Sequence, residues 1–289
     1  AGPDREWPEP DAFVGRDSEL DLADSIYCET LAGSARLILI EGEAGTGKTA
    51  LCRALGRRLC GQRGRPLIIG TGFSPLVGDP YAAFREALGI LTGDLASHVG
   101  IGAVCADNAE RLERSVPANV RALLETGREL IGTLISPDSI MQALHELKAP
   151  GDVLSEARGQ LDAISRLATN APPRRSLFER FSALVGSIAL RHPIVLVIDD
   201  LHWADEASIG LLLFLLRHTQ DSRLLVIACY RASEVVVPGI DSRRFLTAAL
   251  EERLRTTRGS RIVLDESGDL EFLEALVDYL GIGTAGALI

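Results

Sequence analysis

The sequence lacks several features that mark particular classes of protein. It has only two lysines, Lys48 and Lys148, a single methionine, and 5% aromatic residues. No stretch is long and apolar enough to cross a bilayer, and the first residues lack the basic-then-apolar order of a signal peptide. A formal net charge of -10 argues against direct docking on the phosphate backbone of nucleic acids. These absences predict a cytoplasmic protein with no membrane partner.

The five cysteines show neither metal-ligand nor redox spacing. They are scattered along the chain, mostly inside apolar runs, at Cys28, Cys52, Cys60, Cys105 and Cys229. This distribution predicts buried thiols in a reducing compartment rather than a metal or redox site.

Apolar residues make up 46% of the 289 residues, which is enough for a sizeable core. Residues 1–11 are rich in proline and charge and are expected to form a disordered or extended lead-in. One domain is expected to span residues 12–268, with a helical insertion at about 95–170. Residues 269–289 are interpreted as the start of a truncated helical lid. Because the chain begins at Ala1 without methionine, we expect it to be a piece of a longer protein.

Short apolar runs alternate with helical periodicities along the chain. The expected strands cover residues 37–40, 67–69, 194–198, 224–229 and 261–264. The run before Asp199 shows no polar alternation, as expected of a central parallel strand that is covered on both faces. Ser176 and Glu179 form a capping-box pattern, and Asp205 is expected to be the N-cap of a later helix. The alternation predicts an α/β fold with a doubly wound parallel sheet.

The segment from Gly42 to Thr49 matches the pattern G-x-x-x-x-G-K-[ST] of a P-loop, or Walker A motif, between a predicted strand and a predicted helix. Its glycines let backbone N–H groups approach phosphates, and the helix start adds partial positive charge. Lys48 can reach the β- and γ-phosphates, and the hydroxyl of Thr49 can bind magnesium. The alternative is an ordinary glycine-rich turn. The full match and its placement favour nucleotide binding.

Asp199 and Asp200 follow the third predicted strand and predict a Walker B site, because carboxylates at the C-terminal ends of parallel strands face the ligand crevice. Asp199 is expected to hold magnesium, and Asp200 to act as the general base on an attacking water. Alternatively, the two carboxylates are turn residues that cap the next helix. Arg231 follows the fourth strand and could contact the γ-phosphate, although spacing alone favours a surface arginine. His202 and Trp203 are interpreted as structural, with the indole packed under the loop.

Four strings, FVGRDSEL, GEAGTGKT, VLVIDDLHWADEAS and ACYRASE, together resemble the STAND class of P-loop ATPases, specifically the ATPase modules of large LuxR-type (MalT-like) bacterial transcription regulators. The resemblance implies an ASCE or AAA-like P-loop NTPase fold, in which the strand before Arg231 lies beside the P-loop strand. It also implies that residues 14–16 line the adenine and ribose, and that Arg231 senses the γ-phosphate. The nucleotide-binding residues expected are Val14, Gly15, Arg16, Gly42, Ala44, Gly45, Thr46, Gly47, Lys48, Thr49 and Ala50. Thr49 and Asp199 are expected at the metal, and Asp200, Lys48 and Arg231 in catalysis.

The resemblance implies a regulatory switch that binds ATP or ADP with Mg²⁺, hydrolyses ATP slowly, and self-associates in the ATP state of a transcriptional activator. Similar modules are attached to some class III adenylyl cyclases and serine/threonine kinases, which is an alternative output. A small-molecule kinase or an AAA-type DNA-loading ATPase is less favoured, because the insertion shows no acceptor site and the composition is acidic. No arginine finger can be assigned. Contact with DNA is expected only through a domain missing from this chain.

Overall fold

The centre of the fold is a sheet of five parallel strands in the order β2-β3-β4-β1-β5. The computed structural model describes residues 16–74, 79–95, 106–167, 172–231, 233, 252, 255 and 259–264. The strands are β1 (Arg36–Gly42), β2 (Leu67–Gly72), β3 (Ile194–Asp199), β4 (Leu224–Tyr230) and β5 (Ser260–Leu264). Every strand predicted from an apolar run is present. β4, which precedes Arg231, pairs with β1, which precedes the P-loop, so the implied neighbour relation is confirmed.

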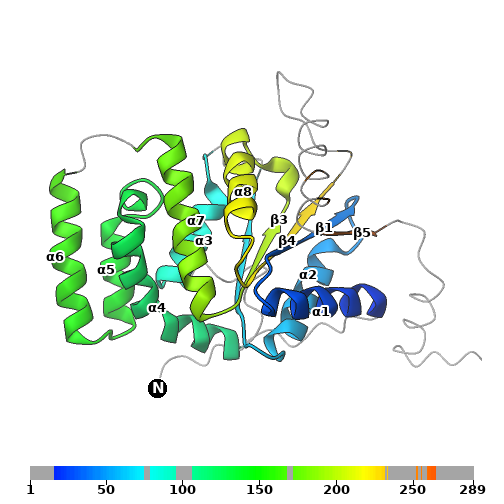
Figure 1. Ribbon diagram of the computed structural model, residues 1–289, viewed down its shortest axis with the longest axis horizontal. Helices are drawn as coiled ribbons and strands as arrows, with labels where there is room; N and C mark the ends of the chain where they lie inside the picture. The colour runs from blue at the N-terminus through cyan, green and yellow to red at the C-terminus, as the bar shows by residue number, and fades with distance from the viewer. Residues whose placement is uncertain are drawn as a thin grey trace, which may run out of the picture.

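Helices cover both faces of this sheet, which confirms the doubly wound arrangement (Figure 1). One face carries α1 (Asp17–Leu31) and α2 (Lys48–Cys60), and the other carries α3 (Ala82–Thr92), α7 (Arg174–Arg191) and α8 (Glu206–His218). Three more helices, α4 (Ala106–Thr126), α5 (Pro137–Glu146) and α6 (Gly151–Leu167), form an outer group. The outer group packs against α3 and α7, on the side away from β5. Short 3₁₀ turns are η2 (Arg128–Leu130) and η3 (Leu201–Trp203).

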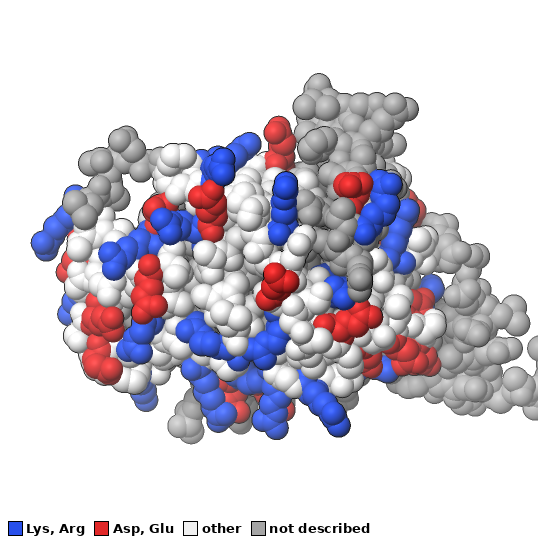
Figure 2. Space-filling model, viewed as in Figure 1, with Lys and Arg blue, Asp and Glu red and all other residues white. Residues whose placement is uncertain are grey.

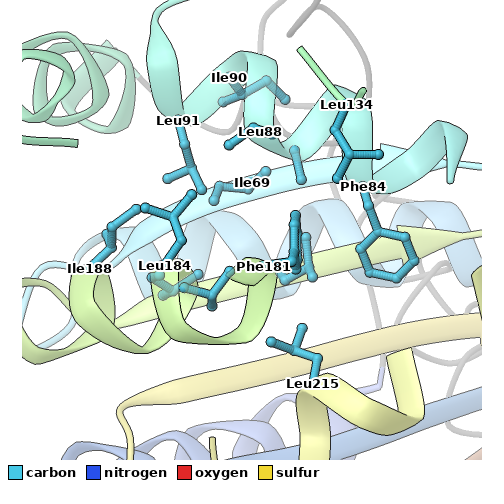
Figure 3. Packing of buried hydrophobic residues seen from close by; sticks show 14 of the residues in the cluster. Ile69, Phe84, Leu88, Ile90, Leu91, Leu134, Phe181, Leu184, Ile188 and Leu215 are labelled. Atoms are coloured by element: carbon cyan, nitrogen blue, oxygen red, sulfur yellow. The ribbon is translucent and has the colours of Figure 1, made fainter. Parts of the chain in front are cut away.

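Alternate side chains of a strand fall into two separate apolar cores. In β1, Leu39 belongs to the core that includes α3 to α8, whereas Ile40 belongs to the core under α1 and α2. Figure 3 shows the larger core, where the ring of Phe84 meets that of Phe181 edge to face with centroids 5.5 Å apart. Because both faces of the sheet are covered, each central strand needs an uninterrupted apolar run.

The N-cap of α8 is confirmed. The carboxylate of Asp205 accepts a hydrogen bond from the backbone N–H of Ser208 at 3.0 Å, which satisfies a donor that the first turn of a helix leaves without a partner. The hydroxyl of Ser208 in turn accepts from the backbone N–H of Tyr81 at 3.0 Å, just before α3. The cap therefore also ties the start of α8 to the start of α3.

The prediction of a capping box at Ser176 and Glu179 is wrong. α7 already begins at Arg174, so Ser176 lies inside the first turn rather than before the helix. Its hydroxyl donates to Glu129 instead, and Glu179 accepts from Arg175 at 2.9 Å. A contact with η2 has replaced the local cap, and a sequence pattern cannot foresee a partner that far along the chain.

Part of the predicted organisation falls outside the described residues, including the lead-in at 1–11 and the lid at 269–289, so the domain boundaries stay predictions. The described parts of 95–170 contain α4, α5 and α6. Pro117 lies within α4 without ending it. None of the described helices is long and apolar enough to cross a membrane. On the face drawn in Figure 2, basic side chains gather along the lower edge, and both signs are mixed elsewhere.

Candidate functional site

The loop between β1 and α2 depends on glycine at several positions. Gly45 and Gly47 have φ values of +85° and +88°, in the left-handed region that other residues rarely adopt. A Cβ atom at Gly42 would lie 2.5 Å from the Thr46 hydroxyl and 2.9 Å from the carbonyl oxygen of Leu264. By contrast, a Cβ at Gly45 or Gly47 would meet no atom within 4 Å. The loop is therefore tightly packed at its base and open at its tip, which leaves room for a ligand against its backbone.

Lys48 begins α2 and points back into the loop. Its side chain is buried, and its Nζ donates to the carbonyl oxygen of Glu43 at 2.6 Å. The Thr46 hydroxyl donates to the same carbonyl at 3.0 Å. The carbonyl oxygen of Glu43 therefore accepts a hydrogen bond from the Lys48 ammonium group, which was predicted from the sequence to bind phosphates. A phosphate oxygen is a stronger acceptor for an ammonium than a neutral carbonyl, so a bound nucleotide could take over this contact.

Thr49 and Asp199 meet although 150 residues separate them. The Thr49 hydroxyl donates to a carboxylate oxygen of Asp199 at 2.7 Å. The other carboxylate oxygen accepts from the backbone N–H of Asp200 at 2.9 Å, which fixes the orientation of the group. A hydroxyl and a carboxylate are hard oxygen ligands of the kind that Mg²⁺ prefers, so these two residues fit the expected metal.

A metal held only by protein side chains finds no support in the described ranges. There, no group of three or more His, Cys, Asp or Glu side chains is placed to hold a metal ion. Mg²⁺ in nucleotide sites commonly uses one or two protein ligands, together with waters and phosphate oxygens. The sparse pair of Thr49 and Asp199 therefore suits Mg²⁺ bound with a nucleotide better than a permanent structural metal.

Asp200 sits in a strained and electrostatically sensitive position. Its backbone is left-handed, with φ +53° and ψ +41°, where Asp is tolerated better than most residues. Burial, and next the charge of Asp199, raise the pKa of the Asp200 carboxyl, whereas His202, Arg231 and Lys48 act to lower that pKa. The structure thus places Asp200 within the electrostatic reach of both cations that the sequence assigned to the site.

Arg231 lies directly after β4 and is half-buried. Its charge acts to lower the pKa of two carboxyls, Asp200 after β3 and Glu43 in the P-loop. The adjacent pairing of β1 and β4 explains this position, because parallel neighbours end at the same edge of the sheet. Lys48, Thr49, Asp199, Asp200 and Arg231 are therefore gathered at one edge.

The structure gives less support to several other residues that were predicted to bind nucleotide. Val14 and Gly15 lie outside the described residues. Arg16 precedes α1 and forms an ion pair with Glu19 at 3.1 Å, so its guanidinium is already engaged there. Ala44 and Ala50 are exposed. The role of residues 14–16 in lining adenine and ribose stays a prediction.

Near the site, Trp203 differs from the sequence-based interpretation and Glu43 was missed by it. Trp203 is 40% exposed, so the expectation that its indole packs under the loop is wrong. His202 is the buried one, and its Nε2 lies 3.8 Å from a carboxylate oxygen of Asp200. Glu43 received no role, although its carbonyl and its carboxylate both make contacts at the site. Only its place inside the P-loop pattern could have drawn attention to it.

The cysteines only partly follow the prediction of buried thiols. Cys52 of α2 and Cys229 of β4 are fully buried, with their sulfur atoms 3.0 Å apart. This contact and burial raise the pKa of the Cys229 thiol. Cys28 is exposed and Cys60 is disulfide-bonded, which corrects the prediction for both residues. Cys105 lies outside the described residues.

The chain is similar to a curated protein over part of its length and aligns with a chain of a solved structure. An uncharacterized protein of Rhizobium meliloti (strain 1021) is 28% identical over 203 residues, which cover 69% of this chain and 16% of that protein. A chain in a structure titled "Structure of Drosophila ORC bound to DNA" aligns with 87% of this chain and 94% of its own length. Its identity of 9% and TM-score of 0.32 are too low to carry an argument.

The family comparison is stronger. The model of the AAA ATPase domain matches residues 12–227, which is more than half of the chain. The match contains the Gly42–Thr49 loop together with Asp199 and Asp200, the parts that the fold brings to one edge of the sheet. An α/β P-loop NTPase fold, with the nucleotide binding that this family implies, follows. The chain belongs to the AAA ATPase domain family.

Proposed function

We propose that this domain is a nucleotide-dependent switch that binds ATP or ADP with Mg²⁺ and hydrolyses ATP slowly. The observation that carries the proposal is the 2.7 Å hydrogen bond between Thr49 and Asp199, beside the buried ammonium group of Lys48. A metal-binding hydroxyl, a carboxylate and a cation at the mouth of a glycine loop are the parts that nucleotide triphosphate chemistry needs.

Each residue has a distinct proposed role. Lys48 binds the phosphates, with backbone N–H groups of residues 42–50, and Thr49 and Asp199 hold Mg²⁺, which neutralises charge on the phosphates. Asp200 orients or deprotonates the attacking water, and Arg231 contacts the γ-phosphate. Asp200 suits this role because its raised pKa makes it a better proton acceptor than an ordinary aspartate once it is ionised.

The finer proposal is a module of a large LuxR-type (MalT-like) transcriptional activator, of the STAND class. ADP would hold the parent protein closed, and ATP would permit an open, self-associating state. The γ-phosphate can shift such an equilibrium only through contacts that exist in one state. One charge-assisted contact, worth about 1.5–3 kcal/mol, changes the populations tenfold or more. The motifs support this output, and DNA contact belongs to another domain of the parent protein.

The decisive experiment is to purify the domain without added nucleotide, denature it, and identify any released nucleotide by chromatography. We expect bound ADP in the wild type and in Lys148→Ala, the matched control at the only other lysine. Lys48→Ala should contain none and should bind Mg-ATP at least about tenfold more weakly, because it loses a charge-assisted contact. A wild-type protein that is empty and also fails to bind Mg-ATP would contradict the proposal.

The same preparation separates the rival functions. Stimulated transfer of phosphate to a small molecule would favour a kinase, and salt-dependent binding of DNA by this domain would favour a DNA-loading ATPase. A regulatory switch predicts neither phosphate transfer to a small molecule nor DNA binding. It predicts slow release of phosphate from ATP whether or not small molecules or DNA are added. Fusion of the module to a cyclase or kinase would leave these results unchanged and alter only the output.

A further inference from the structure

A pair of hydrogen bonds joins the P-loop to the segment after β4. The carboxylate of Glu43 accepts from the backbone N–H of Ser233 at 3.3 Å through one oxygen, and from the Ser233 hydroxyl through the other. The two residues are 190 positions apart in the sequence. Both carboxylate oxygens are used by one partner residue, so the contact fixes direction as well as distance.

Glu43 makes separate contacts through its backbone and through its side chain. Its backbone carbonyl holds Lys48 and Thr46, as described above, while its side chain holds Ser233. A ligand that drew Lys48 away from this carbonyl would therefore act on the same residue that binds Ser233. The fold therefore connects the phosphate-binding lysine to the segment after β4 through a single residue.

Ser233 is also two residues from Arg231. Hydrogen bonds from Ser233 lower the pKa of the Glu43 carboxyl, and the charges of Lys48 and Arg231 act in the same direction. The Glu43 carboxylate thus lies in the field of the two cations proposed to contact phosphates. Ser233 therefore contacts the P-loop through Glu43 and stands two positions from Arg231 in the sequence.

We propose that Ser233 is a positioning residue: through its two hydrogen bonds to Glu43 it holds Arg231 against the P-loop and thereby sets the preference of the site for ATP over ADP. This inference rests on the proposed function, in which Arg231 contacts the γ-phosphate. ADP has no γ-phosphate, so its binding does not need Arg231 in place. Ser233 therefore acts on the difference between the two nucleotides rather than on nucleotide binding as such.

The test is to measure the affinities of Mg-ATP and Mg-ADP by calorimetry for the wild type, Ser233→Ala and Ser233→Thr. Ser233→Ala should weaken Mg-ATP binding about tenfold and change Mg-ADP binding by less than about twofold, as expected for one hydrogen bond to a charged group. Ser233→Thr keeps the hydroxyl and should retain the wild-type ratio of affinities. Ser155→Ala, an exposed serine in α6, is the control and should leave both affinities unchanged.

A second variant tests whether Ser233 acts through Glu43. Glu43→Gln keeps the side-chain length but cannot accept from Ser233 at both ends. In the Glu43→Gln background, Ser233→Ala should therefore alter the ATP-to-ADP ratio by less than about twofold, as expected of coupled residues. Equal losses for both nucleotides in Ser233→Ala, no loss for either, or independent effects of the two changes would each overturn the inference. A wild-type protein that binds neither nucleotide would instead refute the proposed function.

Discussion

The edge of the sheet that carries Asp199 and the helical layer that packs on the same strands differ in what holds them together. At the edge, polar side chains make a few directed contacts, as between Thr49 and Asp199. Asp200 beside them has a strained, left-handed backbone and a raised carboxyl pKa. In the helical layer, buried apolar residues make many undirected contacts, as between Phe84 and Phe181. The difference teaches that function and stability depend on separate residues in this domain. Substitutions can test that separation from either side.

The largest expected effect is on the helical layer. Phe84 is 1% exposed, so Phe84→Ala leaves a cavity and should lower the free energy of unfolding by about 3–5 kcal/mol, as measured by chemical denaturation. Nucleotide affinity of the folded fraction should stay close to that of the wild type. Leu190→Ala, at a leucine that is 72% exposed, is the control and should cost no more than about 0.5 kcal/mol. A large loss of affinity at unchanged stability in Phe84→Ala would break the comparison.

Asp200→Asn should lower activity and leave stability intact, the reverse of what is expected for Phe84→Ala. Loss of the general base should slow phosphate release about a hundredfold or more. Because burial raises the Asp200 pKa, the favourable contribution of this group is complete below the ordinary aspartate pKa and is lost as the pH rises through the raised value. At neutral pH the neutral amide avoids this loss, and Asn also tolerates a left-handed backbone.

The melting temperature of Asp200→Asn should accordingly equal or exceed that of the wild type at pH 7, and any advantage should vanish on acidification. Thermal unfolding across this pH range, together with phosphate release at pH 7, is the measurement. A variant that is both slower and clearly less stable would show that Asp200 supports the fold, and the two regions would then not be separable at this residue.

The smallest expected effect lies where the two regions meet. Asp205 follows η3 and caps α8, so Asp205→Ala should lower the free energy of unfolding by about 1 kcal/mol, because a backbone N–H of the first turn loses its partner. Its effect on phosphate release should be minor. Asp221→Ala, at an exposed aspartate before β4, removes the same charge without a cap and serves as the control in the same denaturation experiment. Equal losses in both variants would mean that charge, rather than the cap, is what matters.

Local patterns predicted the elements of this fold well. Strands β1 to β4 were visible as apolar runs because a strand covered on both faces must be apolar throughout. β5 lies at the edge of the sheet with Val263 54% exposed, and its apolar run is short. The N-cap Asp205 was visible because its partner is three residues away. The capping box at Ser176 failed because a distant acceptor, Glu129, competed with the local one. The prediction that the Trp203 indole is packed under the loop failed for a similar reason, because the exposure of an indole depends on which distant parts of the chain cover it.

The sequence by itself determined the chemistry of the P-loop, because Gly42, Lys48 and Thr49 lie within one turn and helix start and need only short-range geometry. The tertiary structure decided contacts between distant groups that no pattern predicted: Ser233 with Glu43, and Cys52 with Cys229. The meeting of Asp199 with Thr49 was expected from the two motifs, and the fold supplies its geometry. The physical reason is that a parallel sheet brings the ends of strands together according to strand order. Strand order follows from how helices pack on both faces, which no local pattern records.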